Sequence, residues 1–191
     1  ILEDESPLTG SGGQRAPSLL FPMEALFEAF VAKHLARQLA CGYTLKTQVR
    51  KCSLVTHQQQ EWFRLKPDLI ALSAHKNHLV MDAKWKLIDG RKNNGSDKYG
   101  LSQADFYQLY AYGQNYLDDQ GDMALIYPKT ADFDRALPVF EFSRPEGLRL
   151  WVLPFCLRER VLVLPPCGKL DALFDPNAAF PKLDTPVAVD R

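Results

Sequence analysis

The sequence predicts an α/β protein, with α+β as the alternative, in which helices flank a sheet. Two stretches show the helical spacing of apolar residues, and several short segments show the alternating or continuously apolar pattern of strands. These segments follow in the order helix, strands, helix, strands, which is typical of helices layered on a sheet. The chain has 191 residues, a length that suits one domain built around one hydrophobic core.

Composition excludes several classes of protein. The hydrophobic fraction of 46% and the charged fraction of 24% are ordinary for a globular protein, which excludes whole-chain disorder, collagen and coiled coil. Lys plus Arg and Asp plus Glu both number 23, so only the distribution of charge can indicate a polyanionic partner. No apolar run approaches the ~20 residues that span a bilayer, and no signal-peptide pattern opens the chain. We therefore expect no association with a membrane.

Both ends of the chain differ in composition from the middle. Residues 1–18 contain three glycines and two prolines among polar residues and predict a linker or tail. Residues 165–191 are rich in Pro, Asp and Ala and predict a loosely attached C-terminal tail. The predicted domain is therefore 19–164.

The four cysteines, Cys41, Cys52, Cys156 and Cys167, include no C-x-x-C pair, so the spacing of a zinc site is absent. In a chain of this size with an ordinary core, such cysteines indicate free thiols in a reducing compartment. We expect a cytoplasmic location.

The first helix is predicted from Pro22 to Cys41. Pro22 suits the first turn, and Gly42 suits the position after the last. Glu24 and Glu28 are four positions apart and share one face of this helix. The apolar stripe consists of Leu26, Phe27, Phe30, Val31, Leu35 and Leu39.

Strands are predicted in the segment that follows. The predicted strands are 43–49, 62–65, 69–72 and 78–86, with a polar connection at 57–60. A short polar turn at 75–77 joins the last two strands into a hairpin.

The second half begins with a polar, glycine-containing loop over residues 89–100. A helix is predicted from Ser102 to Leu117, and Asp105 gives its start a capping-box pattern. Strands are predicted at 123–127, 137–142 and 149–157.

The residues most able to take part in catalysis or metal binding lie on the predicted hairpin. Asp82 and Lys84 are two positions apart on one strand and therefore point to the same face. Asp68 lies at the start of the partner strand, where the hairpin can bring it beside Asp82. Acidic side chains among apolar strands are costly to bury unless they are compensated. A divalent cation such as Mg²⁺, which prefers carboxylate oxygens and water, would compensate the two carboxylates.

Five segments carry a resemblance to a known family. In chain order they are FPMEALFEAFV, LKPDLIAL, VMDAKWKLID, SQADFYQLYAYG and ALIYP, which together extend from Phe21 to Pro128. The pattern P-D…D-x-K resembles the PD-(D/E)XK nuclease superfamily. The longer segments resemble the McrC family, the cleaving subunits of McrBC modification-dependent restriction systems. The resemblance implies a restriction-endonuclease-like fold with a central mixed β-sheet flanked by helices.

The resemblance also implies roles for single residues. Asp68 and Asp82 would bind the metal, and Lys84 would be the catalytic lysine. A glutamate of the first helix would complete the metal site, with Glu28 as the first choice and Glu24 as the second.

The second helix adds two residues to the expected site. Gln108 and Tyr112 are four positions apart and resemble the Q-x-x-x-Y motif of some branches of the superfamily. Gln108 would help to orient water, lysine or phosphate, while Tyr112 is equally well explained as a core aromatic residue. Trp85 is expected in the core, and Asp105 is assigned only its capping role.

The distribution of charge predicts a basic face for DNA. Residues 29–60 contain five Lys or Arg and no acid, whereas residues 118–146 contain seven acids and three bases. Such a face would bind phosphates without regard to sequence. The residues expected to contact DNA are Lys46, Arg50, Lys51, Lys86, Arg91 and Lys92.

The resemblance implies a DNA endonuclease that uses Mg²⁺, for which Mn²⁺ can substitute, in a restriction system of the 5-methylcytosine type. The implied partners are double-stranded DNA, an McrB-like AAA+ GTPase and a second copy of the chain for double-strand cleavage. The chain has no G-x-x-x-x-G-K-S/T motif, so it is not the motor itself. The alternatives are another PD-(D/E)XK nuclease, such as an exonuclease or repair enzyme, and a non-cleaving DNA-binding or assembly module.

Overall fold

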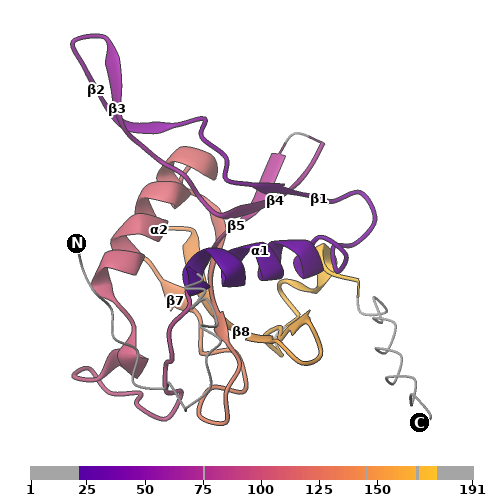
Figure 1. The fold of residues 1–191 in the computed structure, drawn as a ribbon. Coiled ribbons are helices and arrows are strands. Elements are labelled where there is room, and N and C mark those ends of the chain that lie inside the picture. Colours follow the sequence, from indigo (N-terminus) through magenta and orange to yellow (C-terminus); the bar gives the residue numbers. More distant parts are fainter. Residues whose placement is uncertain (1–21, 75, 145, 167, 176–191) are drawn as a thin grey trace, which may run out of the picture.

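The computed structural model describes residues 22–175 except for 75, 145 and 167 (Figure 1). A seven-stranded sheet runs through its centre in the order β1-β4-β5-β6-β8-β7, and β9 pairs with β8. Pairing is antiparallel from β1 to β5, parallel from β5 to β8, and antiparallel again at β7 and β9. The strands are β1 (Thr44–Thr47), β4 (Leu69–Ser73), β5 (Lys76–Ala83), β6 (Gly121–Pro128), β7 (Phe140–Glu141), β8 (Leu148–Cys156) and β9 (Val161–Leu162).

One helix packs on each face of this sheet. Alternate residues of β4 point to opposite sides, so Leu69 packs with helix α1 (Met23–Leu35) and Ile70 with helix α2 (Gln103–Tyr116). Both clusters are fully buried at their centres. The predicted α/β class with a mixed sheet and flanking helices is therefore confirmed.

Helix α1 is shorter than the predicted span from Pro22 to Cys41. Pro22 is the residue before the helix, and the helix ends at Leu35. After it, the buried Gln38 donates to the carbonyl of His34 and accepts a hydrogen bond from the backbone of Leu162. The second of these contacts ties the chain after α1 to β9, although the apolar spacing continues.

Two strands form a separate hairpin outside the main sheet. They are β2 (Ser53–His57) and β3 (Gln60–Arg64), joined by a turn in which Gln58 and Gln59 have φ of 46° and 64°. The predicted strand at 62–65 corresponds to part of β3, and the predicted connection at 57–60 contains the turn, but β2 is not predicted by the sequence. Figure 1 shows this hairpin extending away from the body of the molecule.

Other boundaries also differ from expectation. Strand β5 ends at Ala83 rather than residue 86, and the predicted strand 137–142 is reduced to β7. The loop 89–100 contains the short helix η1 (Lys98–Gly100). Trp85 was wrongly expected in the core, because its side chain is 37% exposed and contacts the ring of Phe27 at a centroid distance of 5.4 Å.

The described core includes residues beyond 164, the predicted end of the domain. Leu170, Leu173 and Phe174 are buried in the core beside α1, and η2 (Asp171–Leu173) lies in this segment. The domain therefore continues past residue 164 to at least Phe174, because these apolar side chains complete the core. The predicted tail at 1–18 lies outside the described residues.

The three described cysteines, Cys41, Cys52 and Cys156, are free thiols as expected, and Cys167 lies outside the described residues. Among the described helices, none has the length and apolar character needed to cross a membrane.

Candidate active site

The acidic residues and the lysine singled out in the sequence lie around one cavity of about 630 Å³. Helix α1, the chain before β4, the end of β5 and helix α2 all contribute to its wall. The lining residues are Glu24, Ala25, Glu28, Asp68, Asp82, Ala83, Lys84, Trp85, Lys86, Ser102, Asp105 and Gln108.

Asp82 and Lys84 form an ion pair at the end of β5. Lys84 Nζ lies 2.6 Å from Asp82 Oδ2, and the Asp82 side chain is only 2% exposed. The Lys84 backbone N–H donates to the carbonyl of Ile126 at 2.9 Å, which extends the pairing with β6 beyond the last residue of β5. The strand geometry is therefore retained at Lys84, and the two side chains share one face as the spacing predicted.

Asp68 adds a half-buried carboxylate beside the buried Asp82. Its Oδ2 accepts a hydrogen bond of 2.9 Å from the backbone N–H of Ala83, which holds Asp68 against the end of β5. Burial, and then the charge of Asp82, raise the pKa of Asp68 to about 7. Burial also raises the pKa of Asp82, although the charge of Lys84 opposes this change. Both groups thus occupy an environment that disfavours their ionised forms.

Gln48 is a site residue that the sequence analysis missed. Its side-chain amide donates to Glu28 Oε1 and, at 3.4 Å, to Asp68 Oδ1. Its backbone N–H donates to the Asp68 carbonyl at 2.9 Å, and its φ of 52° is unusual for a residue other than glycine. An uncharged residue at the end of a predicted strand carries no signal in the sequence that would distinguish it.

Gln108 links Lys84 and Asp82 to helix α2. Its Oε1 accepts from Lys84 Nζ at 3.0 Å, and its Nε2 donates to Asp82 Oδ1 at 3.1 Å. Gln108 Nε2 also donates to the Tyr112 hydroxyl at 2.7 Å, and this hydroxyl donates to the carbonyl of Lys66. Burial raises the pKa of Tyr112 to about 12, so the hydroxyl keeps its proton as a donor.

Asp105 has a different role from the predicted one. The side chain of Ser102 makes no capping hydrogen bond, and the Asp105 backbone N–H donates to the Ser102 carbonyl instead. The Asp105 carboxylate lies 3.8 Å from Lys84 Nζ and accepts a hydrogen bond from the Tyr127 hydroxyl. The capping-box pattern therefore does not account for Asp105, whose carboxylate lines the cavity.

The chemistry of the donor set suits a hard cation. Glu28, Asp68 and Asp82 offer only oxygen atoms to the cavity, which are the ligands that Mg²⁺ prefers. Within residues 22–175, apart from the three undescribed positions, no three His, Cys, Asp or Glu side chains already converge as a metal site. Nitrogen atoms of Gln48 and Lys84 contact these carboxylates instead. A cation would bind through the remaining lone pairs of these oxygens, while Gln48 and Lys84 keep the carboxylates oriented.

The residues predicted to contact DNA are dispersed. Lys86 lines the site cavity and donates to the Gly100 carbonyl at 2.7 Å. Lys46 and Lys51 line a separate small cavity of about 60 Å³, and Arg50 and Lys92 are exposed.

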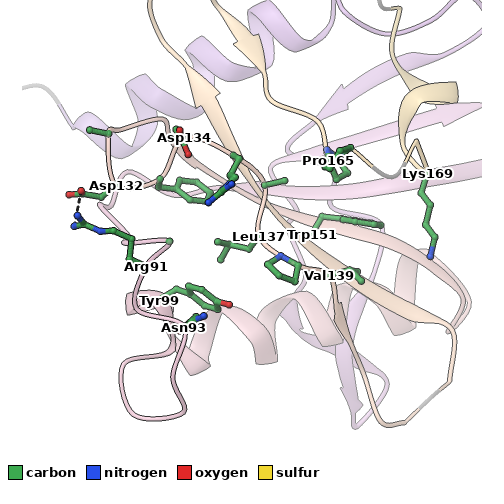
Figure 2. A pocket seen from close by; sticks show the side chains of 17 residues that line it. Arg91, Asn93, Tyr99, Asp132, Asp134, Leu137, Val139, Trp151, Pro165 and Lys169 are labelled. Atoms are coloured by element: carbon green, nitrogen blue, oxygen red, sulfur yellow. Dashed lines mark ion pairs between the residues drawn. The ribbon is translucent and has the colours of Figure 1, made fainter.

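Arg91 lies at another cavity, of about 730 Å³, whose lining includes none of the predicted metal ligands (Figure 2). Its guanidinium pairs with Asp89 at 3.0 Å and with Asp132 at 2.8 Å. Hydrogen bonds from Arg91 lower the pKa of Asp89 to about 2. The charge of Arg91 is thus already compensated by two carboxylates.

The fold and the site define an α/β protein with partly or fully buried acidic residues and a lysine at the end of a mixed sheet. Residues 1–128 match the family model described as "McrBC 5-methylcytosine restriction system component". The chain belongs to this family, which confirms the resemblance carried by its motifs.

Comparison with solved structures supports the fold. The chain is similar to a chain in the assembly described as Thermococcus gammatolerans McrB AAA+ hexamers with bound McrC. The TM-score is 0.52 at 18% identity, and the match covers 70% of the present chain. The match spans only 28% of the length of that chain. No curated protein matches the sequence.

Proposed function

We propose that this chain is a Mg²⁺-dependent DNA endonuclease of the PD-(D/E)XK type and the cleavage subunit of a modification-dependent restriction system. One observation carries the proposal: Asp68, Asp82 and Lys84 lie around one cavity, with both carboxylates in surroundings that raise their pKa values. Perturbed titratable groups gathered in a cleft are typical of a functional site. Membership of the McrBC family supports the same reaction class.

The proposed roles follow from the chemistry of each group. Asp68, Asp82 and Glu28 would hold the cation, which when bound activates water and neutralises charge on the phosphodiester. Lys84 would orient the attacking water or stabilise the charge that develops on the phosphate. Gln108 would hold Lys84, because its Oε1 accepts a hydrogen bond from Lys84 Nζ. Water attacks phosphorus, the bond to the leaving oxygen breaks, and that oxygen takes up a proton.

The proposed partners are double-stranded DNA and an McrB-like AAA+ GTPase, with dimerisation supplying two active sites for a double-strand break. The similar solved assembly contains McrB hexamers with bound McrC, which supports a motor partner.

The test is nicking and linearisation of a plasmid with Mg²⁺ or Mn²⁺, comparing the chain with its Asp82→Ala and Lys84→Ala variants. We expect cleavage that needs the metal and falls at least about 100-fold in each variant, because each removes a group that acts in the transition state. Asp134→Ala, which removes an exposed carboxylate outside the site cavity, is the matched control. Far-ultraviolet circular dichroism would verify that each variant is folded.

Cleavage at the wild-type rate by either site variant would reject the assigned site. Cleavage only of linear DNA would indicate an exonuclease. If the chain alone does not cut, addition of an McrB-type motor, GTP and methylated DNA distinguishes a motor-dependent nuclease from a non-cleaving module.

A further inference from the structure

The β2–β3 hairpin, residues 53–64, is a projecting arm of the molecule (Figure 1). Its two strands pair with each other and with no strand of the main sheet. All of its residues except Ser53 are exposed, including four large apolar side chains. These are Leu54, Val55, Trp62 and Phe63, of which Phe63 is 69% exposed. An isolated two-stranded hairpin with apolar groups in water gains little from its own pairing, so these side chains are available to a partner.

Side chains along the arm are arranged by chemical type. The tip, residues 57–60, consists of one histidine and three glutamines, all exposed. The apolar side chains follow in the middle, where the ring of Trp62 lies 4.9 Å from that of His57. Exposed cations stand at and just beyond the base of the arm: Arg50, Lys51, Arg64 and Lys66. The single acid, Glu61, lies 3.6 Å from Arg64.

The base of the arm is attached to the wall of the candidate site. The chain enters the arm shortly after Gln48 and leaves it shortly before Asp68. Helix α2 holds both connections, because the Tyr116 hydroxyl contacts the carbonyls of Val49 and Leu65 at 3.3 and 3.1 Å. The hydroxyl of Tyr112, which hydrogen-bonds Gln108, donates to the Lys66 carbonyl at 3.0 Å. A ligand of the arm would therefore lie beside the cavity that contains Asp68 and Lys84.

We propose that the β2–β3 arm enters a groove of duplex DNA, with its glutamines and aromatic rings at the bases and its basal cations at the phosphates. The inference rests on the proposed function and extends it to the mode of DNA contact. A two-stranded ribbon fits the major groove, and each strand of five residues reaches about 17 Å. Glutamine amides can both donate to and accept from base edges, and arginine and lysine neutralise phosphates. This order of amides, rings and cations, with one compensated acid, favours DNA over a protein partner.

The test measures binding of the full chain to a fluorescent 30-base-pair duplex by anisotropy in EDTA, so that cleavage plays no part. We expect Gln58→Ala/Gln59→Ala and Trp62→Ala/Phe63→Ala each to weaken binding about tenfold, since each removes side chains that would touch the bases. Leu157→Ala, a change at another exposed apolar residue, is the matched control and should bind like the wild type.

Intrinsic fluorescence gives a second measurement that needs no destabilising change. Duplex DNA should quench emission from Trp62, and the quenching should be clearly smaller in Trp62→Phe, which keeps Trp151 and Trp85, the latter in the wall of the site cavity. Wild-type affinity in both double variants, or no binding of duplex by the folded chain, would overturn the inference.

Altered self-association of the double variants with unchanged DNA affinity would instead assign the arm to contact with a second copy. The plasmid assay tests the proposed nuclease independently. If the chain cuts plasmid normally but the double variants bind duplex with unchanged affinity, only the proposed role of the arm is rejected. If the arm substitutions weaken DNA binding but the chain shows no metal-dependent cleavage, only the proposed nuclease activity is rejected.

Discussion

The side-chain amide of Gln48 lies between Glu28 and Asp68, two carboxylates that would otherwise face each other across the cavity. Glu28 is thereby connected to the hydrogen-bond network of the site, whereas Glu24 lines the same cavity without a described hydrogen bond. This distinction supports Glu28 as the first choice among the two glutamates for the proposed metal site.

Replacing Gln48 should therefore weaken metal binding. For Gln48→Ala we expect the Mg²⁺ concentration that gives half-maximal cleavage to rise by about tenfold, because the carboxylates lose the donor that orients them. The comparison is Gln114→Ala, which removes an exposed glutamine from α2. A midpoint that is unchanged, or that falls, would contradict the positioning role of Gln48.

The raised pKa of Asp68 predicts that stability depends on pH. The pKa is about 7 in the folded chain against an ordinary value of 3.8, so folding favours the protonated acid. This contribution to stability is complete below about pH 4 and is lost as the pH rises through about 7. Without metal, the melting temperature should therefore fall across this range.

Asp68→Asn should reduce that pH dependence and raise the melting temperature at pH 8, because the amide oxygen can still accept from Ala83 without a charge in the half-buried site. Melting curves in EDTA for this variant and for the exposed Asp134→Asn would measure the effect. Asp134→Asn should show the pH dependence of the wild type. If the melting temperature of Asp68→Asn also varied with pH as in the wild type, the raised pKa of Asp68 would be contradicted.

Helix α2 is the element that connects the parts of the site. Gln108, Tyr112 and Tyr116 lie four positions apart along it, and they contact Lys84, Asp82 and the backbone at the base of the arm. Gly113 allows the helix to lie close to the sheet, because a Cβ there would be 2.7 Å from Leu148 Cδ1 and 2.8 Å from Met123 Sδ. Both neighbours are fully buried and have little freedom to move away.

Gly113→Ala should consequently destabilise the chain. Overpacking costs about 1–3 kcal/mol, and the higher helix propensity of alanine offsets up to about 1 kcal/mol of this. We expect a lower urea midpoint and slower cleavage, since a shift of α2 moves Gln108. Gly95→Ala is the control, because a Cβ at Gly95 meets nothing within 4 Å. Equal urea midpoints for the two variants would show that the helix adjusts without cost.

On the scale of the whole molecule, a formal net charge of zero conceals a strongly uneven distribution. Exposed Arg50, Lys51 and Lys66 stand near the arm, whereas Arg91 is paired with carboxylates. DNA affinity would therefore depend on a local group of cations rather than on the total charge.

The salt dependence of DNA binding tests this distribution. Replacing Arg50, Lys51 and Lys66 by alanine should reduce the slope of log K against log salt by about 0.9 for each phosphate that the variant no longer neutralises. The triple variant of the exposed Lys129, Arg135 and Arg158 changes the net charge equally and should leave the slope unaltered. If instead the slope fell in the Lys129, Arg135 and Arg158 variant and was unchanged in the Arg50, Lys51 and Lys66 variant, DNA would bind another face of the molecule.

The sequence by itself determined the class of fold, the β4–β5 hairpin and the grouping of Asp68, Asp82 and Lys84. These features depend on short-range periodicity, since residues two apart on a strand share a face whatever surrounds them. Gln108 and Tyr112 followed from helical spacing together with the family resemblance.

Only the tertiary structure decided the position of Gln48, the orientation of Asp105, the early end of α1, the projecting arm and the burial of Phe174. Each of these depends on interactions between distant segments: Gln48 meets Glu28 across 20 residues, and Gln38 meets Leu162 across 124. Local sequence patterns do not predict such long-range hydrogen bonds, because burial and hydrogen-bond partners are determined only when the sheet and helices pack together.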